Sequence, residues 1–119
     1  VHATPEEYDD CFAKIAAHGA VERPGKAYVK AFNCFVNVGP DAAACRAEVK
    51  NHLSDFHGPP TQDDTVERWG VAGPPAEVAA RLQAFIDRGV TVFQLVIGSP
   101  DQFGQMRRIA EDVLPLLKR

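Results

Sequence analysis

Residues 89–98 read GVTVFQLVIG, and this stretch decides the fold class. Between the two glycines the run is almost continuously apolar, which is typical of a parallel strand buried on both faces, with Gln94 as the exception. We therefore expect a strand over residues 90–97. Apolar residues at helical spacing precede and follow it, from Pro75 to a stop at Gly89 and again over 101–114. The order helix, buried strand, helix indicates an α/β fold.

A second strand is expected over residues 28–38, which are rich in β-branched and aromatic side chains. Successive side chains of a strand alternate between its two faces. One face here carries Phe32, Cys34, Val36 and Val38, and the other carries Ala31, Asn33, Phe35 and Asn37. Two asparagines on an otherwise apolar strand need hydrogen-bond partners if they are buried.

The first helix is expected over residues 5–18. Thr4 is a good N-cap and Glu7 lies three residues later, so that the two can form a capping box. Pro5 suits the first helical position. Gly19 is expected to end this helix, because glycine readily adopts the backbone conformation that follows a helix.

Two further helices follow the first strand. Asp41 is expected to cap a helix over 42–57, which the two prolines at 59–60 help to end. A short helix is expected at 63–69, within the irregular segment 58–73. Because this segment is long and lies next to the ends of the strands, we expect it to act as a mobile lid.

Apolar residues at helical spacing mark the side of each helix that is expected to face the core. In the helix 42–57 these residues are Ala42, Cys45, Val49, Leu53 and Phe56. In the final helix they are Phe103, Met106, Ile109, Ala110 and Val113. Trp69 is expected to be a packing residue that closes the segment 58–73.

The order of the elements predicts an α/β fold with parallel strands and right-handed crossovers. We expect residues 1–119 to form a single domain. Only two strands are convincing, and two adjacent parallel strands leave two open edges, whereas parallel sheets are nearly always covered and multi-stranded. The missing strands must come from a preceding part of the protein or from another copy of the chain.

Composition narrows the function classes. The formal net charge is −3 with both signs scattered, which argues against a nucleic-acid-binding protein. No apolar run is long enough to span a bilayer, and the three cysteines lack the spacing of a disulfide framework, which favours a reducing cytoplasm. His52 and His57 are five residues apart and do not share a helix face, so no metal site is expected.

Several motifs then occur in a specific order. Residues 4–8 read TPEEY, residues 33–38 read NCFVNV, residues 69–79 read WGVAGPPAEVA, residues 88–95 read RGVTVFQL and residues 113–115 read VLP. In this order and spacing the chain resembles the C-terminal region of the luciferase-like monooxygenase family. The resemblance covers nearly all 119 residues. Pro74 and Ala76 depart from the family pattern, which has a Thr or Ser cap and an acidic residue there, and a lost cap costs a helix about 1 kcal/mol.

The resemblance implies a fold and a chemistry. The family forms a TIM-like (β/α)8 barrel of roughly 250 residues or more. This chain would match only its C-terminal part, after the sixth strand, so that much of the flavin-phosphate site would lie upstream. Members are oxidoreductases that use reduced FMN with oxygen, or a deazaflavin for hydride transfer, on a small organic substrate. The cofactor binds at the C-terminal mouth of the barrel.

In a barrel of this kind the functional groups lie where the strands end. In this chain those positions are Asn37 and Gly39 after the first strand, and Ile97, Gly98 and Ser99 after the second. Ser99 precedes a helix N-terminus, where a hydroxyl and backbone N–H groups can hold a phosphate, sulfonate or carboxylate. The alternative is that Ser99 or Asp101 simply caps that helix.

Positions inside the barrel are the second group of candidates. Asn33, Phe35 and Asn37 would face the interior if the alternate residues face the helices, and Gln94 would point inward beside them. Polar side chains there can orient a ligand, or they can bond to one another and to buried water. The sequence does not identify a catalytic residue.

Two functions remain open at this point. The chain is either part of a flavin-dependent luciferase-like oxidoreductase or monooxygenase, or a non-catalytic partial barrel that binds itself or a partner through its open sheet edges. In the second case a symmetric pair of chains would cover the exposed strands. We expect that no complete flavin site lies within this chain alone.

Overall fold

The computed structural model describes residues 2–58 and 61–118. Within them the chain is a mixed α/β fold with five α-helices and a parallel three-stranded sheet. The elements are α1 (Pro5–Glu22), β1 (Ala31–Val38), α2 (Ala42–His57), α3 (Asp63–Trp69), β2 (Gly70–Gly73), α4 (Pro75–Ile86), β3 (Val92–Ile97) and α5 (Gln102–Arg108), followed by the π-helix η1 (Ile109–Val113) and the 3-10 helix η2 (Leu114–Leu116). The expected strand pair is confirmed, because β1 and β3 are adjacent and parallel, from Ala31 opposite Val92 to Val36 opposite Ile97.

The expectation of only two strands was wrong. Residues 70–73, which read GVAG, form the short strand β2, which pairs in parallel with β1 from Phe35 opposite Gly70 to Val38 opposite Gly73. Its two glycines and one alanine have low strand propensity, so only its neighbour β1 makes it a strand.

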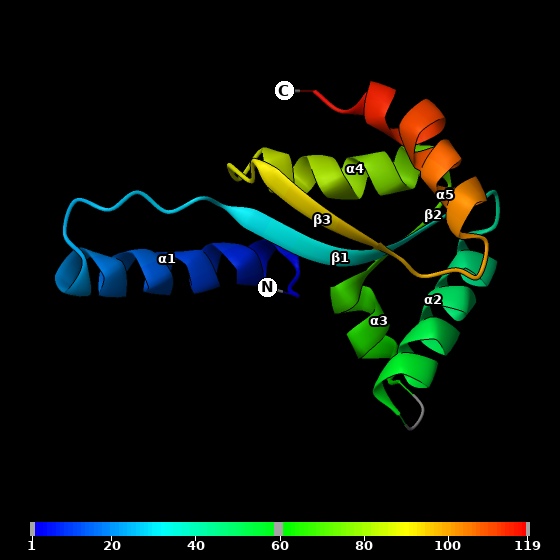
Figure 1. Cartoon of the computed structure of the whole chain (residues 1–119), viewed down its shortest axis with the longest axis horizontal. Helices are drawn as coiled ribbons and strands as arrows, with labels where there is room; N and C mark the ends of the chain where they lie inside the picture. The colour runs from blue at the N-terminus through cyan, green and yellow to red at the C-terminus, as the bar shows by residue number, and fades with distance from the viewer. Residues whose placement is uncertain (1, 59–60, 119) are drawn as a thin grey trace.

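The strand order is β2-β1-β3, with β1 in the middle (Figure 1). In a (β/α)8 barrel, consecutive strands lie side by side. Here the chain runs from β1 to β2 on one edge and then crosses back past β1 to β3 on the other. Two right-handed crossovers in opposite directions place their helices on opposite faces of the sheet.

The two hydrophobic clusters confirm these opposite faces. Phe32, Cys34, Val36 and Val38 of β1 pack with α4, through residues such as Leu82 and Phe85, and with Ile109 and Val113 of η1. Phe35 points the other way and packs with Val49 and Leu53 of α2 and Val66 of α3. The alternation of side chains predicted for this strand is therefore confirmed.

Several helix boundaries also agree with the sequence. Thr4 and Glu7 form the capping box of α1, with Glu7 N–H donating to Thr4 Oγ1 at 3.2 Å. Asp41 caps α2 by accepting from two backbone N–H groups. The short helix at 63–69 is present as α3, and Gly89 has a φ of +86° after the end of α4. The prolines at 59–60 lie outside the described residues.

Other boundaries differ. The helix α1 continues past Gly19 to Glu22, and Gly19 instead gives room to the ring of Tyr28, since a Cβ there would lie 2.5 Å from Tyr28 Oη. The strands begin later than expected, at Ala31 and Val92. The segment expected to be an irregular lid is largely ordered as α3 and β2.

The end of the chain shows the largest differences in burial. The final helix is not one uniform α-helix but α5, η1 and η2 in succession, and its Phe103 and Met106 are 86% and 57% exposed rather than buried. Phe56 of α2 is exposed as well. The strand β3 is not buried on both faces, because Val92 is 49% exposed and Gln94 is also exposed. Among the described residues β3 has no neighbour on its outer edge.

No helix in the described part of the chain has the length and apolar character needed to cross a membrane.

Candidate functional site

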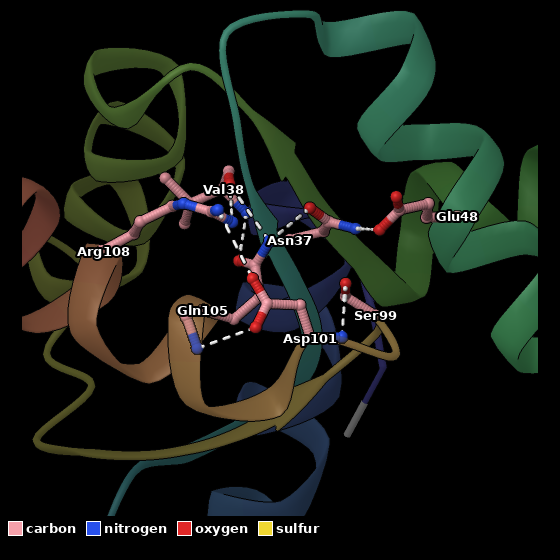
Figure 2. Close-up of polar contacts among 8 residues, drawn as sticks. Asn37, Val38, Glu48, Ser99, Asp101, Gln105 and Arg108 are labelled. Carbon is pink, nitrogen blue, oxygen red and sulfur yellow. Dashed lines mark hydrogen bonds and ion pairs between the residues drawn. The ribbon is translucent and has the colours of Figure 1, made fainter.

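A pocket of about 600 Å³ opens at the carboxyl ends of β1 and β3 (Figure 2 shows several of its polar side chains). In open α/β sheets, ligands bind in the crevice beyond the carboxyl ends of the strands, where the crossovers diverge to opposite faces. The boundary between β1 and β3 is such a point, because the helical segments that follow these two strands lie on different faces of the sheet. The helix α2 follows β1 and packs on one face, and η1, which follows β3 and α5, packs on the other. The pocket is lined by residues that include Asn37, Gly39, Asp41, Cys45, Glu48, Pro75, Ser99, Asp101, Gln105, Arg108 and Asp112.

Asn37 and Gln105 form the buried floor of this pocket. Both side chains are 2% exposed. Gln105 Nε2 donates to Asn37 Oδ1 at 2.9 Å and to the Val38 carbonyl at 3.1 Å, while its Oε1 accepts from the Val38 N–H at 2.7 Å. These bonds fasten α5 to the end of β1.

Both N–H donors of the Asn37 amide also form hydrogen bonds. Its Nδ2 donates to Glu48 Oε2 of α2 at 2.8 Å and to the Gly98 carbonyl at 3.1 Å. Asn37 therefore joins three elements rather than pointing a free amide at a ligand. Asn37 thus matches the alternative in which the polar side chains of β1 bond to their neighbours. Through its hydrogen bond, Asn37 also orients the carboxylate of Glu48, which lines the pocket.

Ser99 and Asp101 shape the turn into α5. Ser99 is 3% exposed, and its Oγ accepts from the Asp101 N–H at 3.3 Å. Asp101 Oδ1 accepts from the Gly104 N–H at 3.0 Å and so caps the helix. The start of α5 is thus already capped by a carboxylate of the chain itself, so that in the capping alternative the cap is Asp101, while Ser99 bonds to the backbone of that cap residue.

The charge of the pocket is mainly negative. Four carboxylates line it, from Asp41, Glu48, Asp101 and Asp112, against the single guanidinium of Arg108. Arg108 lies 3.4 Å from Asp101 Oδ2, so its charge is partly neutralised. A ligand with a phosphate or carboxylate group would meet repulsion at this wall.

The thiol of Cys45 also lines the pocket. Burial raises the pKa of this thiol, and the neighbouring carboxylates of Glu48 and Asp41 raise it further. Burial raises the pKa of the Cys34 thiol, in the core beneath, to about 12. A thiol is a nucleophile only as the thiolate, so neither cysteine is poised for nucleophilic chemistry at neutral pH.

Of the predicted site residues, Asn37 and Ser99 line this pocket, and Gly98 adjoins it through the hydrogen bond from Asn37 Nδ2 to its carbonyl, whereas the other three lie elsewhere. Phe35 is a core residue between β1 and α2. Asn33 is half-buried on the same face, and its Oδ1 is buried without a hydrogen-bond partner among the described residues. Gln94 lies opposite Asn33 on β3 and is exposed. The structure therefore brings together Asn37, Gly98 and Ser99, places Phe35 in the core beneath α2, and leaves Asn33 and Gln94 on the less covered half of the sheet.

An aromatic cluster covers part of that face. The ring of Trp69 stacks on His2 with centroids 4.5 Å apart, and His57 approaches Trp69 edge-on at 5.5 Å. The packing role expected for Trp69 is confirmed. Burial lowers the pKa of His2, which keeps the stacked imidazole neutral near pH 7.

Sequence reasoning missed Gln105, Glu48, Arg108 and Asp112. Gln105 was hidden because the predicted apolar stripe passed through Phe103 and Met106. The buried stripe is Gln105, Ile109 and Val113, at spacing of four residues. The signal that could have identified Gln105 is its position at helical spacing from two buried apolar residues, because a buried polar side chain needs hydrogen-bond partners.

No family model and no curated protein matches this chain. Solved structures do match it. One is an F420-dependent secondary alcohol dehydrogenase in complex with an F420-acetone adduct, at a TM-score of 0.77 and 18% identity, covering 99% of this chain and 42% of that protein. Another is the coenzyme F420-dependent tetrahydromethanopterin reductase from Methanopyrus kandleri, at a TM-score of 0.66 and 16% identity, covering 99% of this chain and 44% of that protein.

At these identities the likeness shows the fold alone. The chain has the fold of part of two oxidoreductases that depend on coenzyme F420, a deazaflavin. It spans less than half of the length of either protein.

Proposed function

We propose that this chain is the C-terminal part of a deazaflavin-dependent, luciferase-like oxidoreductase and forms one wall of its binding pocket. The observation that carries the proposal is the 600 Å³ pocket at the carboxyl ends of β1 and β3. Its size is that of a small-molecule site, and its position is the one that α/β sheets use for ligands. The likeness to two F420-dependent proteins favours a deazaflavin over FMN.

The sheet order can be reconciled with a barrel. In this proposal β1 and β3 are neighbouring barrel strands, and β2 is a short strand within the segment that connects them. Because β2 pairs only with residues 35–38, the edge of β1 at residues 31–34 stays open, as does the outer edge of β3. Strands from a preceding segment or from another copy would pair there, which is how the chain would join a larger barrel.

The residues present fit only part of such a cofactor. The ring system of a deazaflavin would fit the volume, with hydrogen-bond acceptors from Glu48 and the Gly39–Pro40 turn on the wall. The phosphate does not fit, because four carboxylates line the pocket and the start of α5 is capped by Asp101. We therefore assign the phosphate to the upstream part of the protein and derive no reaction step through the cofactor.

The role of this chain is then to bind and orient. When a deazaflavin is bound, it supplies hydride transfer, and the protein supplies position and electrostatics. Asn37 and Gln105 hold the floor rigid through their mutual hydrogen bonds, and they orient the Glu48 carboxylate toward the pocket. The acidic wall favours a neutral substrate, such as an alcohol or a ketone, over a carboxylate.

The proposal is tested by fluorescence titration of the chain with four compounds: a 5-deazariboflavin, its 5′-phosphate, riboflavin and FMN. We expect saturable binding of the deazariboflavin at about 10–100 µM, because only part of the site is present, and weaker binding of both phosphates, because of the acidic wall. Ala44→Trp, which would fill the pocket from α2, should abolish binding. Ala47→Trp, one turn further on the same helix and outside this pocket, is the matched control.

Two results of this titration would contradict the proposal. If none of the four compounds binds at about 500 µM, or if Ala44→Trp and Ala47→Trp bind equally well, the pocket does not serve a flavin or deazaflavin. The non-catalytic module, which associates through its open sheet edges, would then be the better account. The exposed strand β3 is the observation that favours this second function.

A further inference from the structure

The C-terminal helical segment, α5 to η2, carries apolar side chains on two of its sides. Gln105, Ile109 and Val113 are buried against β1 and α4. A second line of residues, at spacing of three or four residues, is exposed. We call this line the outer stripe, and it consists of Phe103, Met106, Ala110 and Leu114. Phe103, Met106 and Leu114 are 86%, 57% and 50% exposed.

Exposed apolar side chains that are contiguous on one helix mark an interaction surface more strongly than scattered ones do. A helix that is apolar on two sides is usually buried on both. The outer stripe extends for about three helical turns, and at Leu114 it runs into an apolar groove beside β3 that also contains Ile86, Val90, Phe93 and Leu117. Small Ala110 in the middle would let another helix approach closely.

The charged residues beside the outer stripe indicate which partner would bind there and in which orientation. Arg107 lies next to its first half and Glu111 next to its second half, both are exposed, and neither forms an ion pair with the described residues. The stripe is therefore self-complementary when two copies run antiparallel. With a two-fold axis beside the middle of the stripe, Phe103 meets Leu114 of the second copy, and Arg107 lies beside Glu111 of the second copy.

A parallel pair would instead bring Arg107 against Arg107, which is unfavourable. From this charge pattern we infer that the outer stripe is a docking surface for a second copy of this chain, which packs antiparallel across a two-fold axis. Two-fold dimers are the commonest symmetric assemblies, since one self-complementary patch serves both subunits. The surface is separate from the carboxyl-end pocket, whose Arg108 and Asp112 lie on the other flank of the segment.

One helix stripe with its groove covers less than the roughly 800 Å² per partner of a standard interface. We therefore expect a dissociation constant on the order of 10 µM rather than nanomolar. Sedimentation velocity of the 119-residue chain between about 1 and 300 µM would measure it. Phe103→Glu should raise the dissociation constant at least tenfold, because it buries a charge at the interface. Phe56→Glu, at another largely exposed phenylalanine on α2, is the control and should leave it unchanged.

A charge-swap double-mutant cycle tests whether the two copies pack antiparallel. Arg107→Glu and Glu111→Arg should each weaken the dimer about threefold to tenfold, and the double variant should restore it to within about twofold. Circular dichroism melting would show that each variant stays folded, as expected for substitutions at exposed positions. A chain that is monomeric at every concentration, a dimer that Phe103→Glu does not weaken, or a double variant that fails to restore the dimer would each overturn the inference.

Discussion

Gln105 is the residue on which the order of the pocket depends most. Its amide makes bonds to Asn37 and to both backbone groups of Val38, all of them buried. Replacing it with alanine leaves the Val38 N–H and Asn37 Oδ1 without partners, and each buried unpaired group costs about 1–3 kcal/mol.

We therefore predict that Gln105→Ala lowers the free energy of unfolding by about 2–4 kcal/mol, measured by urea denaturation. Gln102→Ala is the matched control, because Gln102 is exposed although its amide donates to the Ser99 carbonyl, and it should cost less than about 1 kcal/mol. Equal losses in the two variants would show that the Asn37–Gln105 contact does not hold the floor together.

At the same scale, the sequence predicted part of the pocket. Asn37, Gly98 and Ser99 were found because they follow the ends of strands, and strand ends are visible in the apolar pattern. Glu48 and Gln105 were not found, because each lies on a helix and reaches the pocket only through the packing of that helix on β1. The roles of Asn33, Phe35 and Gln94 in ligand binding stay predictions, since Phe35 is packed in the core and Asn33 and Gln94 lie on the less covered half of the sheet.

Among the elements, the turn between α4 and β3 has the strictest backbone requirement. Gly89 has a φ of +86°, and its N–H donates to the Ile86 carbonyl at 2.8 Å to close the turn. A side chain at positive φ costs roughly 1–2 kcal/mol, although asparagine tolerates this region better than alanine does.

We predict that Gly89→Ala lowers the free energy of unfolding by about 1–2 kcal/mol and that Gly89→Asn lowers it by less than half as much. Thermal unfolding of the two variants beside the parent chain would check this. If the two substitutions cost the same, the positive φ would not be the source of the cost. Crowding would not explain it either, because a Cβ at position 89 would lie at the ordinary contact distance of 3.5 Å from Lys30 Cδ.

The elements that the sequence predicted well were those fixed by local chemistry. The capping box of α1, the Asp41 cap of α2 and the stop at Gly89 depend on side chains within a few residues. The elements that it missed depend on tertiary packing. The strand β2 exists because β1 offers it an edge. The final helix changes to the π-helix η1 shortly before Pro115, which has no backbone N–H with which to continue an α-helix.

On the scale of the whole molecule, several surfaces of the part of the chain that the structure describes are uncovered. The sheet has two open edges, the face near Asn33 and Gln94 is partly bare, and the outer stripe is exposed. The sequence predicted the open edges, because parallel sheets need more strands than it supplied. It did not predict that β1 would be central, since strand order depends on how the crossovers pack and not on local periodicity.

The pocket at the carboxyl ends of β1 and β3 is the central claim, and chemical-shift mapping tests it most directly. A ¹⁵N-labelled chain would be titrated with the non-phosphorylated deazaflavin while backbone amide signals are followed. We predict that the largest shifts fall on Gly39, Gly98, Ser99 and Gln105, around the pocket. Shifts confined to the Trp69 cluster, or no shifts at about 500 µM ligand, would contradict the account.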